Sequence, residues 1–202
     1  MDRVTVLHRD RSHSDAGSGP EVSVVPGQQA MKIRVLGCSG GIGGALRTTA
    51  LLVDDDVLVD AGTGVGDLSL ESLARIDHIF VSHSHLDHVT SIPFLVDTVC
   101  WMRASPLVVY GIKEVLDILK AHLFNWKIWP DFTQIPDGDK PFMVYRELRV
   151  GDVHGRGRVR AEPEVFITHL KPGEGALTMK EVTQAAGRWR PRMLENNQEF
   201  SL

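Results

Sequence analysis

The sequence predicts an α/β fold, and three observations lead to this prediction. Short apolar runs rich in β-branched residues recur along the chain and are bounded by turn-forming residues. Longer segments with apolar residues at helical spacing lie between them. A cluster of histidines directly follows one of the apolar runs, and α/β sheets place polar sites at the carboxyl ends of their strands.

The predicted elements are short and alternate along most of the chain. In the helix predicted over residues 112–124, apolar residues recur at a spacing that gives one apolar face. Strands are predicted over residues 32–36, 48–53, 57–59, 79–81, 107–110, 142–150 and 165–167, and helices over residues 68–73, 89–101, 112–124 and 176–186.

Composition favours one domain with an N-terminal arm. Residues 1–30 are rich in Ser, Gly, Asp and Pro, so we expect a disordered arm there and a folded domain over residues 31–202. A strand-like run begins at Met31, and this methionine is therefore an alternative start to Met1. With 43% hydrophobic residues, the chain can form a core.

Charge, cysteine content and hydropathy indicate a soluble protein of the cytoplasm. The net charge of −4 gives no general attraction to nucleic acid or anionic membrane, and neither is expected as a partner. Two cysteines, Cys38 and Cys100, are too few for a disulfide framework. No apolar run reaches the roughly 18 residues of a membrane-spanning helix.

The histidine cluster is His83-x-His85-x-Asp87-His88, and its side chains are those that bind Zn²⁺ and similar ions. Alternation in an extended turn points His83 and His85 the same way, toward one ion. Asp87 and His88 then fall on the next bend and can face a second ion. The alternative is a histidine-rich surface loop, which the concentration of three histidines beside one acid disfavours.

Two further polar residues follow predicted strands. Asp60 ends the strand over residues 57–59, where it can orient a metal-bound histidine or instead cap the turn at 62–64. His169 follows the strand over residues 165–167 in the same way as His83 follows its own, which favours a ligand role over a core histidine. Lys171 lies just beyond and either contacts a phosphate or is only a solvated lysine.

Two loops are candidate substrate contacts. Gly40 and Gly41 belong to a glycine-rich loop that can bind phosphate through backbone N–H groups, or that serves only as a flexible turn. Trp126 lies in an aromatic-rich loop that can form a wall for a nucleobase. Packing of these rings onto the core is the alternative, and we favour it slightly.

The cluster resembles the signature of the metallo-β-lactamase superfamily. The stretches 58–64 and 31–41 resemble its Asp-x-Gly strand end and its opening strand and loop. Residues 119–136 and 167–174 resemble bacterial class II 3′,5′-cyclic-nucleotide phosphodiesterases. The resemblance implies an αββα sandwich, here incomplete in its second half, because the segment between residues 151 and 163 is short and matches neither the further histidine nor the bridging aspartate of relatives.

The resemblance also implies chemistry. Two Zn²⁺ ions, or Mn²⁺ or Fe²⁺, would be held by His83 and His85 on one side and by Asp87, His88 and His169 on the other. A metal-bound hydroxide, steered by Asp87, would attack a small phosphodiester, most directly a 3′,5′-cyclic nucleotide. The alternative is a truncated, inactive relative that binds metal or a partner, and a homodimer is a further option. A nucleotide-binding module built on the glycine-rich loop is a third, weaker hypothesis.

Overall fold

The structure is a computed structural model of the chain, and it describes residues 4–9, 31–149, 162–167, 192–193 and 195–201. Most of the predicted strands and helices are present, with shifts of a few residues at their ends. The elements are β1 (Val4–Arg9), β2 (Lys32–Gly37), β3 (Ala50–Val53), β4 (Val57–Val59), the 3-10 helix η1 (Thr63–Asp67), α1 (Leu70–Arg75), β5 (His78–Phe80), α2 (Leu86–Val89), α3 (Ser91–Val99), the 3-10 helix η2 (Cys100–Met102), β6 (Leu107–Gly111), α4 (Lys113–His122), β7 (Met143–Glu147), β8 (Glu162–Ile167), β9 (Arg192–Met193) and β10 (Glu199–Ser201).

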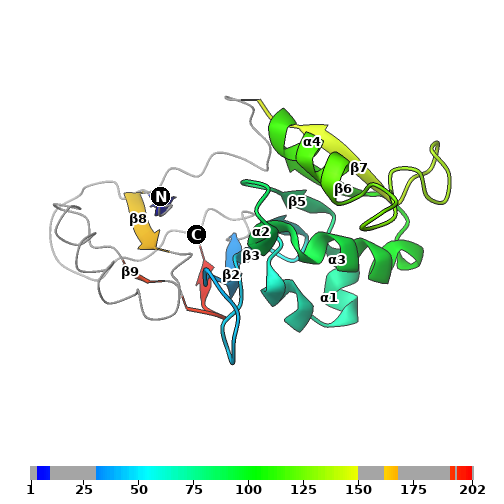
Figure 1. Ribbon diagram of the computed structural model, residues 1–202. Helices are drawn as coiled ribbons and strands as arrows, with labels where there is room; N and C mark the ends of the chain where they lie inside the picture. Colours follow the sequence, from blue (N-terminus) through cyan, green and yellow to red (C-terminus); the bar gives the residue numbers. More distant parts are fainter. Residues whose placement is uncertain (1–3, 10–30, 150–161, 168–191, 194, 202) are drawn as a thin grey trace, which may run out of the picture.

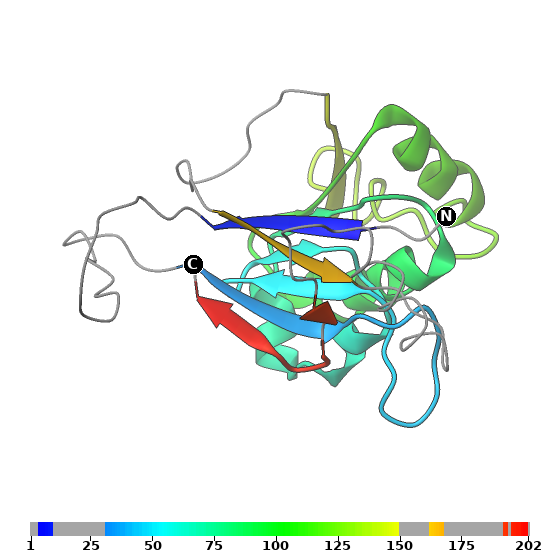
Figure 2. The ribbon, with the colours of Figure 1, turned by 90° about the vertical axis from the view of Figure 1, so that its left-hand side faces the viewer.

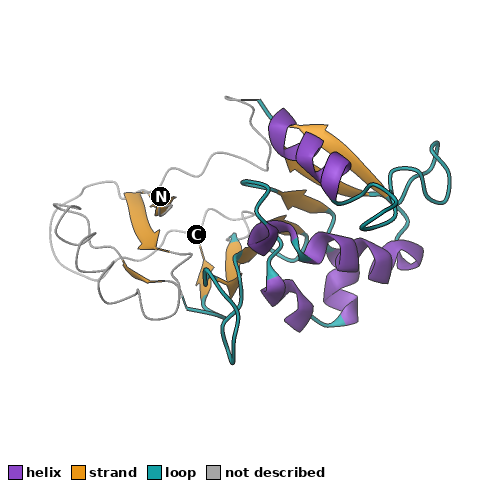
Figure 3. Cartoon of the chain, in the orientation of Figure 1, coloured by secondary structure: helices purple, strands orange, loops and turns teal. Residues whose placement is uncertain are grey.

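The strands form two sheets. The larger has the order β10-β2-β3-β4-β5-β6-β7; its first four strands are antiparallel neighbours, and β4 to β7 run parallel. The smaller has the order β1-β8-β9. Figures 1 and 2 place the small sheet on the side of the large sheet that faces away from α1, α2 and α3. The described layers are therefore helix, sheet and sheet (Figure 3), and the helix predicted over 176–186 lies outside the described residues.

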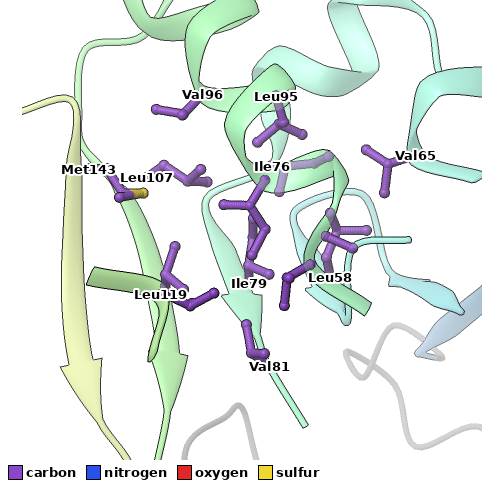
Figure 4. Packing of buried hydrophobic residues seen from close by; sticks show 14 of the residues in the cluster. Leu58, Val65, Ile76, Ile79, Val81, Leu95, Val96, Leu107, Leu119 and Met143 are labelled. Carbon is purple, nitrogen blue, oxygen red and sulfur yellow. The ribbon is translucent and has the colours of Figure 1, made fainter. Parts of the chain in front are cut away.

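The main core lies between the large sheet and the helices (Figure 4). Helix α3 contributes Ile92, Leu95, Val96 and Val99, whose spacing of three or four residues gives one buried face. The residues of α4 that enter the same layer are Val115, Leu116 and Leu119. Leu58 and Ile79, the middle residues of the central strands β4 and β5, are fully buried, whereas the residues on either side of them are partly exposed. A smaller cluster, Ile33, Val35 and Leu51, is separate from this core.

The topology brings several strand ends to one edge of the large sheet. Phe80, Tyr110 and Arg146 lie in register across β5, β6 and β7, so the chain leaves all three strands on the same side. Strand β2 runs antiparallel to β3, which runs antiparallel to β4, so β2 and β4 also end there. The loop after β2, the turn after β4 and the histidine cluster after β5 therefore share the carboxyl edge of the sheet.

Two local expectations differ from the structure. Residues 4–9, within the predicted disordered arm, form strand β1 and pair with β8; the alternating β-branched run that starts at Val4 suits a strand once a partner is available. The helix expected over residues 89–101 is present as α3 and η2, but a separate short helix, α2, precedes it, so Asp87 and His88 lie in a helical turn rather than on a free bend. No helix in the described ranges is long and apolar enough to cross a membrane.

The tight packing of η1 against β2 predicts the effect of two glycine substitutions. A Cβ at Gly64 would lie 2.0 Å from the carbonyl oxygen of Leu36, whereas a Cβ at Gly66 would meet no atom within 4 Å. We expect Gly64→Ala to lower the free energy of unfolding by about 1–3 kcal/mol through overpacking, and Gly66→Ala to change it by less than about 0.5 kcal/mol. Urea unfolding of both variants measures the difference, and equal stabilities would contradict the packing described.

Candidate metal centre

The histidine cluster occupies the connection between β5 and α2. Residues 81–85 leave the carboxyl end of β5, and His85 is the residue that precedes the helix. The rings of His83 and His85 lie 4.6 Å apart, and those of His83 and His88 lie 3.9 Å apart, measured between centroids. The three imidazoles are therefore gathered at one place, although His88 comes from the helix and the other two from the turn.

A buried carboxylate, that of Asp60, lies beneath the cluster. The residue is 4% exposed and follows β4, the strand that pairs with β5. Its Oδ1 accepts the backbone N–H of Ser82 at 2.8 Å, and its Oδ2 accepts the Ser82 hydroxyl at 2.7 Å. The same Oδ2 bonds Nδ1 of His88 at 2.8 Å. Asp60 thus contacts a histidine of the cluster, which is the type of contact that its place at a strand end predicted.

The backbone around Asp60 is held in an uncommon conformation. Its φ is +58°, a left-handed value that Asp and Asn adopt more readily than most residues. Its N–H donates to the carbonyl of Phe80 at 2.8 Å, continuing the β4–β5 pairing by one residue. The carbonyl of His88 accepts the N–H of Ala61 at 2.7 Å. Helix α2 is therefore tied to the turn after β4 by both main-chain and side-chain bonds.

The donor set fits a borderline metal ion. With Nδ1 of His88 bonded to Asp60, its Nε2 lies 3.7 Å from Oδ2 of Asp87. Two ligand atoms on one tetrahedral zinc, each about 2.0–2.1 Å from the ion, are separated by about 3.4 Å, so this pair is close to ligand spacing. In the described part of the chain, no three His, Cys, Asp or Glu side chains are arranged to hold an ion as they stand. His169 and Lys171 lie outside that part.

The glycine-rich loop lies at the same edge of the sheet. Its base is fixed by the paired residues Ser39 and Thr48, and its tip at Gly43 and Gly44 has positive φ values of +140° and +52°. The N–H of Gly41 donates to the Ser39 hydroxyl at 3.3 Å. At the base, Thr48 and Thr63 exchange hydrogen bonds, which ties the loop to η1. The structure thus places Gly40 and Gly41 on the side of the sheet from which the cluster emerges.

The aromatic loop is placed differently. Phe124 and Phe132 are 2% and 3% exposed and belong to the main core, so packing onto the core is confirmed for these two rings. Trp126 is 63% exposed, with a positive φ of +63°. The loop enters β7 at Met143, which pairs with the first residue of β6, so it approaches the sheet at the amino edge. The structure does not bring Trp126 to the cluster, because α4 carries the chain back across the sheet before the loop begins.

Sequence reasoning missed Ser82 and Ser91. The hydroxyl of Ser91 donates to the carbonyl of Gly62 at 2.7 Å. The backbone N–H of Ser91 donates to the carbonyl of Ala61 at 2.9 Å. The available signal was a small hydroxyl residue directly before the first histidine and another at the first position of α3. Serines commonly form hydrogen bonds to backbone groups in turns, so the motif offered no reason to connect these two residues with Asp60 or with the turn that follows it.

The chain is similar in sequence to phosphodiesterases. Residues 68–143 match the family described as cAMP phosphodiesterases class-II. A probable 3′,5′-cyclic-nucleotide phosphodiesterase of Yersinia pestis is 26% identical over 136 residues, which cover 54% of this chain and 38% of that protein. A ribonuclease Z of Halorubrum lacusprofundi is 43% identical over 81 residues, which cover 35% of this chain and 26% of that protein. The chain therefore spans well under half of the length of these relatives.

Solved structures identify the fold. The metallo-β-lactamase fold protein YhfI of Bacillus subtilis superposes with a TM-score of 0.60 at 12% identity, over 87% of this chain and 100% of that one. The chain has the metallo-β-lactamase fold. The resemblance drawn from the sequence motifs, to this fold and to class II phosphodiesterases, is confirmed.

The network beneath the cluster predicts a stability cost for Asp60→Asn. Asparagine suits the left-handed backbone. Its NH₂ group, however, would replace a carboxylate oxygen that accepts hydrogen bonds and would face donors that it cannot pair with. We expect the free energy of unfolding to fall by about 1–3 kcal/mol, the cost of leaving a buried polar group unsatisfied. Urea unfolding measures it, with Asp55→Asn in the exposed turn after β3 as the matched control that stays within about 0.5 kcal/mol.

The thiol at the base of the glycine-rich loop is predicted to be unreactive. Burial raises the pKa of Cys38 from 9.0 to about 11, and the negative charge of Glu195 adds to the rise. Because only the thiolate reacts, alkylation of Cys38 at about pH 8 should be ~100-fold slower than that of an ordinary thiol. Mass spectrometry of the peptide containing Cys38 follows the rate, and the urea-unfolded chain serves as the control. Rapid alkylation of the folded protein would contradict the burial.

Proposed function

We propose that this chain is a metal-dependent hydrolase of phosphodiesters and that 3′,5′-cyclic nucleotides are its first candidate substrates. The observation that supports this most directly is the gathering of His83, His85, Asp87 and His88 over the buried carboxylate of Asp60. The match of residues 68–143 to class-II cAMP phosphodiesterases supports the substrate class, since the matched segment contains the whole cluster.

His83 and His85 would hold one ion, and Asp87 and His88, joined by His169, would hold the other. Bound ions of this kind polarise a phosphoryl oxygen and lower the pKa of a water molecule to about 7. The nature of the ion, whether Zn²⁺, Mn²⁺ or Fe²⁺, follows from availability as much as from the imidazole and carboxylate donors.

The residues of the chain position these groups. The Asp87 side chain is 27% exposed beside the buried His88, so it can accept a hydrogen bond from an attacking water and fix its direction. Asp60 holds the ring of His88 in place from below, at 2.8 Å. The backbone N–H groups of the loop that contains Gly40 and Gly41 are at the edge where a phosphate would enter, and Lys171 is a further candidate phosphate contact.

RNA is a second candidate substrate class. Several relatives carry the name ribonuclease Z, and the one from Halorubrum lacusprofundi is the most identical of those described over its matched segment. Cleavage of an RNA phosphodiester requires the same attack on phosphorus. An inactive metal-binding relative is a third outcome, because the chain spans only part of each curated relative and the residues between 150 and 161 supply no recognised ligand.

The proposal predicts metal-dependent turnover that requires His88. The purified chain, loaded with Zn²⁺ or Mn²⁺, should hydrolyse cyclic AMP, and a chelator should abolish the activity until metal is restored. His88→Ala should lower kcat/KM at least ~100-fold, since removing a group that merely holds a metal ligand already costs 10–100-fold. His122→Ala, at the exposed end of α4, is the matched control and should retain full activity.

The substrates distinguish the candidate functions. Turnover of a structured precursor RNA but not of cyclic AMP would establish the ribonuclease class. Turnover of neither substrate, nor of a generic activated phosphodiester, with two equivalents of metal bound would contradict a hydrolase and favour the inactive relative.

A further inference from the structure

We infer that Ser82 is a positioning residue that makes Asp60 act on two histidines instead of one. This inference deepens the proposed function and rests on it for the identity of the ion, whereas its geometric basis is the set of hydrogen bonds around Ser82. Ser82 was not among the residues that the motif singled out, because it is neither a metal ligand nor an acid.

The Ser82 hydroxyl lies between the carboxylate of Asp60 and the ring of His83. Its Oγ lies 2.7 Å from Oδ2 of Asp60 and 3.0 Å from Nδ1 of His83. Both distances are within normal hydrogen-bond range. The backbone N–H of the same residue donates to the other oxygen of Asp60 at 2.8 Å, which fixes the position of Ser82 independently of its side chain.

The direction of these bonds follows from counting protons. An ionised carboxylate can only accept, so the single hydroxyl proton of Ser82 points to Asp60. The hydroxyl oxygen can then only accept from His83, and the proton of the neutral imidazole must be on Nδ1. His88 bonds the same carboxylate through its own Nδ1 at 2.8 Å and is set in the same way.

One carboxylate therefore sets the tautomer of both rings. Each ring carries its proton on Nδ1 and presents the lone pair of Nε2, which is the form required of a neutral imidazole ligand. His83 and His88 are the residues proposed to hold different ions. Ser82 and Asp60 would thus prepare a ligand for each of the two ions before either is bound, so that less of the binding free energy is spent on ordering the rings.

Ser82→Ala tests the relay cleanly, because it removes the hydroxyl and keeps the backbone N–H bond to Asp60. Ser82 is exposed, so Ser82→Thr has room for a methyl group and restores the hydroxyl. The first readout is the ¹⁵N NMR spectrum of the histidine rings in metal-free protein at about pH 8, where an ordinary imidazole is neutral. The second is the dissociation constant for Zn²⁺, measured by competition with a coloured chelator.

We expect His83 in the unaltered protein and in Ser82→Thr to show only the tautomer with the proton on Nδ1. In Ser82→Ala, His83 should show a mixture of tautomers while His88 is unchanged, because the bond from His88 to Asp60 does not involve the hydroxyl. Zinc affinity should fall ~10–100-fold in Ser82→Ala and recover in Ser82→Thr. Ser84→Ala, which alters the serine on the other side of His83, is the matched control and should leave the His83 spectrum unchanged.

Two results would overturn the inference: an unaltered His83 spectrum in Ser82→Ala, or a Ser82→Thr protein that behaves like Ser82→Ala. Failure of the proposed function is distinguishable from either. If the unaltered chain binds no zinc, the hydrolase proposal fails, whereas the metal-free spectra still decide whether Ser82 relays the influence of Asp60.

Discussion

The carboxylate of Asp60 is the constraint on which the rest of the site depends. It is 4% exposed and receives bonds from a backbone N–H, a hydroxyl and an imidazole. A buried charge is costly unless such donors surround it, so the carboxylate and its donors must be assembled together. These bonds consequently fix the relative positions of three segments: the turn after β4, the connection from β5 to α2, and the first turn of α2.

The mixed topology of the large sheet makes this assembly feasible. Because β4 and β5 are parallel neighbours, the turns that follow them lie side by side, and Asp60 reaches Ser82 directly. The antiparallel strands β2 and β3 place the glycine-rich loop at the same edge, where Gly62 and Gly64 allow a close approach that any side chain would obstruct. At the opposite edge, the aromatic loop and the exposed Trp126 lie apart from this chemistry.

Sequence patterns predicted the strands and helices well where apolar periodicity was clear, as in α4 and β5. The contact between Asp60 and the cluster agrees with the expectation that an acid at the end of an apolar strand needs a partner, while its role toward a metal-bound histidine stays a prediction. The patterns failed where tertiary contacts decide the outcome. Strand β1 pairs with β8, and the short helix α2 contains His88, whose ring bonds Asp60 and whose carbonyl accepts the N–H of Ala61. Trp126 could not be placed, since composition does not say at which edge of a sheet a loop enters.

The hydrogen bonds that join Asp60 to Ser82 and His88, and Ser91 to Gly62, lie within the continuous stretch from Asp60 to Ser91. Strand β5 and helix α2 lie within the same stretch. Such a unit can be inherited whole while the loops and strands beyond it lengthen, shorten or exchange. Proteins of different size can then keep this histidine cluster with its buried carboxylate and diverge through the segments around it.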